Sequence, residues 1–253
     1  MLRNGHAPRC GGGPGTAIVV SAFTLSDGFW SATRSHPCHR LARSGKGLLA
    51  VRTGARAWLL PPSMALWIPA RLPHATGAAG SADVHGARLD PAGCAGAPDE
   101  PTVVAAGPLL SALIGHLDRP DLGREARRRA EAVVLDVLEP LPVTSVSVPE
   151  PVDPRALAVA RALAADPRDN RGLEAWGDRA GTSARTLARL FIAETGLTFG
   201  QWRERLRMQA AMPLLAGDLP IEAVARRVGY GSASSFVAAF HRIVGLTPRQ
   251  YFP

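Results

Sequence analysis

The sequence of 253 residues predicts an α+β fold with two domains, a small β-barrel or sandwich followed by an all-α domain. Short apolar stretches separated by Gly and Pro fill the first part, which is typical of strands joined by tight turns. The last third contains two copies of one helix-turn-helix pattern. A proline-rich stretch at 141–154 predicts a semi-rigid linker between the two domains.

The chain is expected to begin with a disordered segment, residues 1–27, which opens on a Gly-rich stretch. The apolar run at 16–25 resembles a signal-peptide core, but no convincing small-residue cleavage site precedes Asp27. No run approaches the roughly 18 apolar residues that span a bilayer, so no membrane partner is expected. The three cysteines, Cys10, Cys38 and Cys94, have no CxxC spacing, which indicates neither a disulfide framework nor a Cys-rich zinc site and fits a reducing cytoplasm.

The first domain is expected at 28–140. Apolar stretches at 47–54, 57–60 and 65–68 lie at hairpin-like spacing and predict strands. Beyond them, apolar residues recur at helical spacing in two runs, which predicts a helix hairpin whose second arm has an arginine face. The first run is Leu109, Leu110, Leu113, Ile114 and Leu117; the second is Leu122, Ala126, Ala130, Val133, Val134, Val137 and Leu138; the arginines are Arg124, Arg127, Arg128 and Arg129.

The second domain is expected at 155–253 and contains the repeat. Ser183 and Ser232 begin the matching parts of the two copies, at a separation of 49 residues (232 − 183), and an apolar pair and a closing glycine recur at the same separation. A solenoid needs about three copies to bury a continuous core. Two copies instead indicate a protein that binds a DNA duplex through two helix-turn-helix units.

Local chemistry supports each copy. A short helix ends at Gly181 or Gly229, which can adopt a positive φ, and the following serine caps the next helix. An apolar stripe then faces inward, with Leu187 and Phe191 in the first copy. The outward positions are Arg185, Thr186, Ala188 and Arg189 in the first copy and Ala233, Ser234, Ser235, Ala238 and Ala239 in the second.

With these residues in view, 155–253 resembles the tandem helix-turn-helix domain of the AraC/XylS family of transcription regulators. The similarity is closest from Gly229 to Tyr251, where the segment GYGSASSFVAAFHRIVGLTPRQY follows the family signature nearly position by position. The resemblance implies seven helices, at about 154–165, 172–180, 183–194, 199–216, 220–228, 233–244 and 248–252.

Two residues depart from the family pattern. Gly177 stands where the family usually has Ala, which costs about 0.5–1 kcal/mol inside a helix. Pro213 lies within the long connecting helix and removes one backbone hydrogen bond. The run around Pro213 resembles a subgroup of the family that carries proline there, so we expect a tolerated bend.

The resemblance implies that the helices at 183–194 and 233–244 enter successive major grooves of double-stranded DNA. The net charge of +8 and the pI near 10.8 fit an anionic partner, although the basic balance is shared by both halves of the chain. The expected DNA-binding residues are Ser183, Arg185, Thr186, Ala188, Arg189, Arg203, Arg205, Ser232, Ser234, Ser235 and Arg242.

The stretch from Trp58 to His74 resembles the second motif of AraC-type cupin sensor domains, and His36 and His39 stand where histidines of the first motif fall. The expected ligand-binding residues are His36, His39, Trp67 and His74. The three histidines would either form a metal triad or stay unmetallated. Since no Asp or Glu occurs from Arg40 to Val51, the carboxylate of catalytic cupins is missing, and neither an enzyme nor a cofactor is expected.

The sequence therefore predicts a cytoplasmic transcription regulator, an activator or repressor, whose cupin-like domain responds to a small-molecule effector. Its expected partners are double-stranded DNA, the effector, RNA polymerase and a second copy of the chain joined through 109–139. The alternative is a cupin metalloenzyme with an accessory helical DNA-binding domain. A methyl-accepting repair protein is a weaker rival, because its zinc site needs four cysteines.

Overall fold

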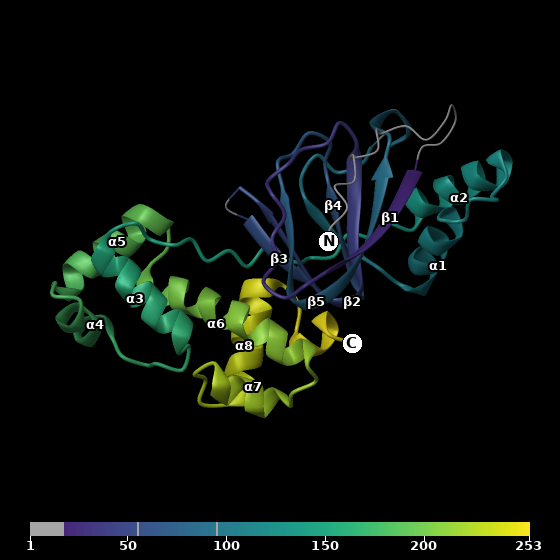
Figure 1. Cartoon of the computed structure of the whole chain (residues 1–253). Helices are drawn as coiled ribbons and strands as arrows, with labels where there is room; N and C mark the ends of the chain where they lie inside the picture. The colour runs from purple at the N-terminus through teal and green to yellow at the C-terminus, as the bar shows by residue number, and fades with distance from the viewer. Residues whose placement is uncertain (1–17, 55, 95) are drawn as a thin grey trace. The chain divides into compact units, whose positions relative to one another are not determined.

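The protein is described by a computed structural model covering residues 18–54, 56–94 and 96–253 (Figure 1). The chain divides into two compact units. The first runs to Gly54 and continues over Leu60–Pro142; the second comprises Ala55–Leu59 and Val143–Pro253. No helix in the described ranges is both long and apolar enough to cross a membrane.

The first unit is built on one antiparallel sheet. Its strands are β1 (Ile18–Leu25), β2 (His39–Thr53), β4 (Met64–Ile68), β5 (Ala75–Leu89) and β6 (Thr102–Ala105), in the order β1-β5-β2-β4-β6. A further strand, β3 (Arg56–Leu60), belongs to the second unit except for its last residue. Within the described residues β1 and β6 do not pair with each other, and only a short bridge at Pro140 lies along the outer edge of β6. The sheet is therefore open, and the expected closed cupin-like barrel is not confirmed.

The expectation that residues 1–27 are disordered is wrong for Ile18–Leu25, which form β1. β1 pairs along its whole length with β5, from Ile18 opposite Leu89 to Leu25 opposite Ala82. The Ile18 side chain is buried, and its backbone N–H donates to Glu131 at 3.0 Å. The hydrogen bonds to β5 hold these residues in a strand, although a Gly-rich stretch precedes them in the sequence. The remainder of that expectation, residues 1–17, lies outside the described residues.

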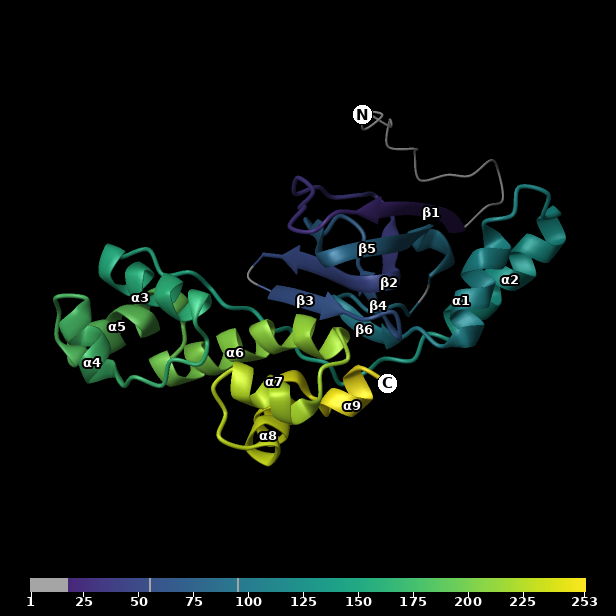
Figure 2. The same ribbon diagram turned by 60° about the horizontal axis from the view of Figure 1, so that its bottom comes forward.

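The predicted helix hairpin is present, and it packs against one face of the sheet. It consists of α1 (Pro108–Leu117) and α2 (Arg124–Asp136), which lie side by side next to the sheet in Figure 2. A short 3₁₀ helix, η1 (Pro91–Gly93), precedes β6. Leu110, Ile114 and Leu117 of α1 and Ala130 and Val134 of α2 join one core with the sheet residues Ile18, Leu41, Ala65, Trp67, Ala87, Leu89 and Val104.

The cysteines do not behave alike. Cys38 is disulfide-bonded, which the odd number of cysteines does not predict. Cys94 is a buried free thiol in the core beneath the hairpin, and burial raises its pKa.

The second unit contains the seven expected helices, each within two residues of its predicted bounds. They are α3 (Pro154–Ala165), α4 (Leu173–Arg179), α5 (Ala184–Thr195), α6 (Phe199–Ala216), α7 (Ile221–Arg227), α8 (Ala233–Val244) and α9 (Pro248–Tyr251). Figures 1 and 2 show α3–α5 at one end of α6 and α7–α9 at the other. As expected, α6 continues through Pro213; its start is fixed by a capping box between Thr198 and Gln201.

Each helix-turn-helix has its own apolar core, and α6 contributes to both. Trp176, Leu187, Phe191 and Trp202 are buried together with α3 in the first. In the second, a line of ring contacts runs through Tyr230, Phe236, Phe240, Tyr251 and Phe252. The connecting helix is therefore held at both ends, which fixes the two units of the repeat on one support.

Candidate nucleic-acid interface

Both turns have the predicted geometry. Gly181 and Gly229 adopt φ angles of +65° and +84°, and each recognition helix begins immediately after a serine cap. Ser183 accepts from the Thr186 N–H at 3.1 Å, and Ser232 accepts from the Ser235 N–H at 3.2 Å. Left-handed glycines, Gly196 and Gly245, end the two helices. The local sequence thus gives α5 and α8 the same kind of preceding turn and the same kind of serine cap.

The first recognition helix, α5, buries Leu187 and Phe191 and turns its basic residues to solvent. Ser183, Arg185 and Arg189 are exposed, and Thr186 and Ala188 are half-buried. Arg185 and Arg189 are four residues apart and so share one face of the helix. This face carries two guanidinium groups suited to phosphate or to guanine edges.

The second recognition helix, α8, presents short polar side chains. Ser232, Ser234, Ser235 and Ala238 are exposed. The expectation that Ala239 faces outward is wrong: it is buried, because Phe236 and Phe240 turn that side of α8 into the core. The first two turns of α8 therefore lack the long cationic side chains found on α5, and the basic residues of α8, His241 and Arg242, lie in its last turn.

The three other expected DNA contacts differ from one another. Arg203 donates to the Arg171 carbonyl at 2.8 Å and lies over the Phe199 ring. Arg242 forms an ion pair with Glu204 at 2.7 Å. Arg205 is half-buried and makes no side-chain hydrogen bond or ion pair with any described residue. Arg205 is consequently the α6 arginine whose guanidinium has no competing partner among the described residues.

Arg207, which no sequence pattern singled out, joins the two halves of the repeat. This buried side chain donates to the carbonyls of Pro167 at 3.0 Å, Asp169 at 3.0 Å and Gly229 at 3.2 Å, and to Asn170 at 2.8 Å. One guanidinium therefore fixes both the loop before α4 and the turn before α8. The available signal was its spacing of four from Arg203 in α6, which places both on the side that meets this loop.

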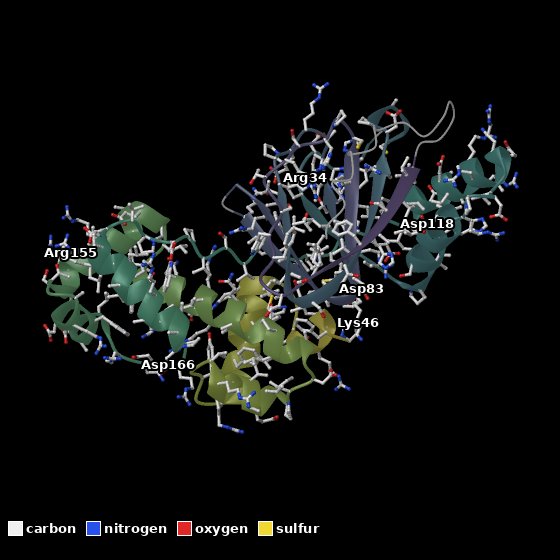
Figure 3. All side chains as sticks on the ribbon, viewed as in Figure 1. Arg34, Lys46, Asp83, Asp118, Arg155 and Asp166 are labelled. Atoms are coloured by element: carbon white, nitrogen blue, oxygen red, sulfur yellow. The ribbon has the colours of Figure 1, made fainter. Side chains whose placement is uncertain are left out.

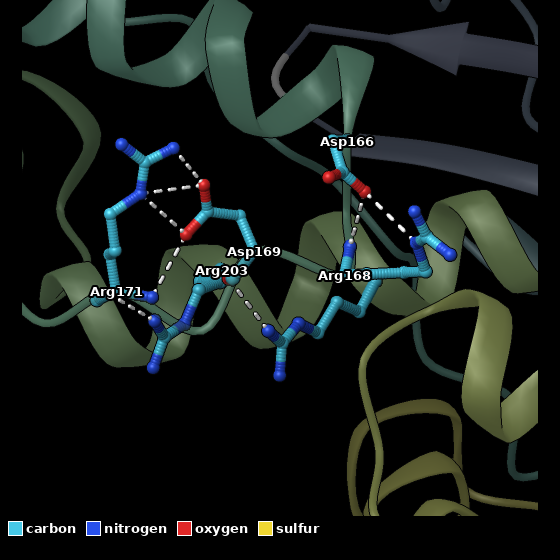
Figure 4. Close-up of polar contacts among 6 residues, drawn as sticks. Asp166, Arg168, Asp169, Arg171 and Arg203 are labelled. Carbon is cyan, nitrogen blue, oxygen red and sulfur yellow. Dashed lines mark hydrogen bonds and ion pairs between the residues drawn. The ribbon is translucent and has the colours of Figure 1, made fainter.

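The loop before α4 is stabilised by two Asp-X-Arg pairs (Figure 4). Asp166 accepts from the backbone and side chain of Arg168, at 3.2 and 3.3 Å. Asp169 forms an ion pair with Arg171, whose carbonyl accepts from Arg203. The side-chain bond from Arg171 lowers the pKa of the Asp169 carboxyl. The carboxylates thus hold the loop itself, and α4 begins after Gly172 without a side-chain cap.

Gly177 has a role that helix propensity does not reveal. A Cβ at this position would lie 2.7 Å from the Thr182 carbonyl and 3.0 Å from the Ala184 backbone nitrogen. The cost of Gly177 to helix propensity is therefore accompanied by a packing role, because the missing side chain lets α4 approach the turn backbone closely.

The ligand-binding residues expected in the first unit separate into two groups. His39 stacks on Trp67, with ring centroids 4.8 Å apart, and its Nδ1 accepts from the Ala70 N–H. His36 and His74 form a second pair, 5.4 Å apart. The strand register places His39 with Leu41 and Trp67 on the hairpin side of the sheet. The three histidines therefore do not form a triad.

A cavity of about 240 Å³ lies beside Trp67, between the sheet and the hairpin. The Trp67 indole donates to the Pro98 carbonyl at 3.0 Å, so the ring is fixed in the wall. The remaining lining is mainly apolar and comes from Cys94, Gly96, Ala97, Val104, Leu135, Leu138 and Pro140. The cavity suits an apolar group, whereas His36 and His74 lie in polar surroundings.

His36 and His74 are held neutral. Burial, together with Arg40, His74, Arg34 and Arg88, lowers the pKa of His36 to about 4. Burial likewise lowers the pKa of His74, against the opposing effect of its hydrogen bond to the Leu72 carbonyl. The His36 Nε2 lies 3.1 Å from the Arg40 guanidinium, which requires this nitrogen to be unprotonated and to accept.

Two capped recognition helices on one connecting helix define a tandem helix-turn-helix, the architecture of a DNA-binding regulator. A helix-turn-helix domain family matches residues 176–253. The regulator NimR of Escherichia coli K12 is 27% identical over 251 residues, covering 98% of this chain and 91% of NimR.

Other relatives match the C-terminal part. The regulator RipA of Corynebacterium glutamicum is 42% identical over 103 residues, covering 41% of this chain and 31% of RipA. An AraC-like transcription regulator of Streptomyces antibioticus is 33% identical over 100 residues, covering 39% of this chain and 33% of that protein. The chain is a transcription regulator with an AraC-type helix-turn-helix DNA-binding domain.

The two turn glycines offer a matched test of the interface. A Cβ at Gly181 would meet no atom within 4 Å, whereas one at Gly229 would lie 2.8 Å from Arg207 Nη2 and 3.0 Å from the Arg168 Cα. We expect Gly181→Ala to lower the free energy of unfolding by about 1 kcal/mol, the cost of a left-handed alanine. Gly229→Ala should cost roughly 1–3 kcal/mol more, through overpacking. Urea unfolding of both variants measures the difference, and equal losses would contradict it.

Ser183→Ala tests the cap of the first recognition helix. Loss of the hydroxyl should lower the free energy of unfolding by about 1 kcal/mol. It should also weaken binding to all DNA sequences alike, because a helix N-terminus contacts phosphate rather than bases. Thermal unfolding and titration with operator and random duplexes measure the two effects. A selective loss of operator binding at unchanged stability would instead make Ser183 a base reader.

The neutral histidines predict a pH dependence of the first unit. In the unfolded chain histidine takes up a proton near pH 6.5, whereas folded His36 does so only near pH 4. Stability is therefore present above pH 6.5 and is lost as the pH falls toward 4. The thermal midpoint should decrease between pH 7.5 and 5.5, and less so in His36→Gln. His241→Gln, at an exposed position in α8, is the control and should keep the full decrease.

Proposed function

We propose that this regulator recognises a specific operator by placing α5 and α8 in two successive major grooves on one face of the duplex. The observation that carries the proposal is the pair of equally capped helices on the two ends of α6. Helix centres about 34 Å apart would match one turn of B-DNA. Arg205 and the helix N-termini hold phosphates, while Arg185 and Arg189 read bases; Arg203 and Arg242 contribute after exchanging their intramolecular partners.

We further propose that the first unit is a sensor for a small molecule and that the regulator acts in the cytoplasm, where its DNA lies. Its histidine pair and its cavity beside Trp67 supply polar and apolar surfaces for a ligand. Leu109 and Val133 are exposed on the hairpin, which supports pairing of two chains through 109–139. Contact with RNA polymerase would then make the protein an activator, and an operator that overlaps a promoter would make it a repressor.

Footprinting on genomic fragments bound by the full chain tests the proposal. Two protected major-groove segments should lie about 10–10.5 base pairs apart on one face of the DNA. Arg185→Ala combined with Arg189→Ala should remove base preference in one segment only. Protection of a single groove, or loss of both segments in this variant, would contradict tandem docking. An effector should change operator affinity by about 5- to 150-fold.

A further inference from the structure

The face of the sheet opposite the hairpin carries an unusual pair of buried cations. Arg40 of β2 and Arg88 of β5 lie directly opposite each other in the antiparallel register. Only 8% of each residue is exposed. Like charges directly opposite each other destabilise a sheet. A sheet in which these arginines had no further role would therefore not be expected to place them opposite each other.

The neighbours of Arg40 are polar but not acidic. Its Nη1 lies 3.1 Å from His36 Nε2, and its buried Nε has no hydrogen-bond partner in the part of the chain that the structure describes. The Arg40 Nη2 lies above Gly86, where a Cβ would come within 3.1 Å of it. Glycine at this position therefore leaves room for the guanidinium along the sheet face.

Two more basic residues complete the cluster. Arg34 pairs in an isolated bridge with His74, which brings its strand segment beside the histidines. Only 2% of His74 is exposed. Its Nδ1 donates to the Leu72 carbonyl, and its Nε2 has no partner among the described residues. The cationic cluster is thus Arg34, His36, Arg40, His74 and Arg88.

No carboxylate neutralises Arg40. Among the described residues no Asp or Glu is hydrogen-bonded or ion-paired to it, and residues 1–17, Ala55 and Ala95 contain no Asp or Glu at all. Figure 3 shows Arg34 at one end of the first unit, with Lys46 and Asp83 at the other end. Burial and the neighbouring Arg34 and Arg88 lower the pKa of Arg40 to about 10, which still leaves it charged at neutral pH.

We infer that this cluster binds the oxyanion of a small ligand, a carboxylate or a phosphate group. The inference rests on the proposed sensor role and names the chemical class of its effector. Guanidinium groups form charge-assisted hydrogen bonds with such oxyanions, and Arg40, whose Nε has no partner among the described residues, is the donor, while Arg88 adds positive charge beside it. The anion supplies the missing negative charge. Protonated His36 and His74 would then add donors, so binding takes up protons and strengthens as the pH falls from 8 to 6.

Calorimetric titration of the full chain with sodium benzoate, inorganic phosphate and uncharged benzamide, at equal ionic strength, tests the inference. Benzoate or phosphate should bind saturably and raise the thermal midpoint, and benzamide should not. The responding anion distinguishes a carboxylate from a phosphate ligand. Binding of benzamide as tight as benzoate, or no saturable binding by either anion, would overturn the site.

The matched variants are Arg40→Gln and Arg43→Gln. Arg43 lies three residues further along β2, is 9% exposed, and pairs with Ala65 and His85 on the hairpin side. Arg40→Gln should weaken anion binding at least tenfold, and Arg43→Gln should leave it unchanged; equal losses would overturn the assignment. If Arg40→Gln fails to fold, NMR titration of the unmodified chain decides, because the anion should raise the pKa of His36.

Operator affinity measured in the same samples separates this inference from the proposed function. Anion binding that leaves operator affinity unchanged keeps the site and removes the effector response. An operator response to another compound, without anion binding at Arg40, keeps the sensor role and overturns the anion site.

Discussion

Arg207→Ala is expected to lower the free energy of unfolding of the second unit by roughly 3 kcal/mol. The substitution removes four hydrogen bonds and leaves the carbonyls of Pro167, Asp169 and Gly229 without their donor. These carbonyls belong to the loop before α4 and to the turn before α8. Both turns should therefore loosen together, which urea unfolding followed by tryptophan fluorescence can measure through Trp176 and Trp202.

Arg205→Ala is the control, two residues earlier in the same helix. Because Arg205 makes no side-chain hydrogen bond or ion pair with any described residue, its loss should change stability by no more than about 0.5 kcal/mol. It should instead weaken binding to all duplexes and reduce the salt dependence by about one phosphate contact. If Arg205→Ala destabilises the unit as much as Arg207→Ala, the bonds of Arg207 do not carry the effect.

Arg189→Ala is expected to weaken operator binding by about 1–3 kcal/mol and to relax base preference in one half of the site. Arg189 is exposed four residues from Arg185, on a helix that begins at the Ser183 cap. Its guanidinium can donate to both O6 and N7 of guanine. Affinity for random duplexes should decrease less, because non-specific binding depends on phosphate contacts.

Ser234→Ala provides the comparison in the second recognition helix. Serine makes shorter and weaker contacts, and the neighbouring Ala238 offers no polar group, so operator affinity should fall less than in Arg189→Ala. Both variants are titrated at one salt concentration with the operator and with duplexes altered in one half-site. Equal losses would remove the predicted asymmetry between α5 and α8.

The second unit could be predicted from its sequence almost completely. Capping serines, left-handed glycines and apolar stripes act over three to five residues, so each of them sets helix bounds with little help from distant contacts. The hairpin of α1 and α2 follows from the same periodicity. In contrast, β5 is rich in Ala and Gly, which have little β propensity, and it becomes a strand because β1 and β2 pair with it on both sides.

The sites depended on contacts between distant segments. The sequence grouped His39 with His36 and His74, but strand alternation turns it to the other face of the sheet. Helix propensity alone predicts that Gly177 destabilises α4, whereas in the fold its missing side chain lets α4 pack closely against the backbone of the turn. In the sequence Arg207 is one of several arginines in α6, and only its hydrogen bonds to the loop before α4 distinguish it from the others.

By itself the sequence determined the tandem helix-turn-helix, its caps and turns, and with them the class of regulator, because these depend on side chains acting on their own backbone. Only the tertiary structure decided that the sheet is open, that Arg207 joins the two turns and that Arg40 lies opposite Arg88. Strand register and the burial of charge arise from pairing between segments far apart in the chain, and no local pattern specifies them.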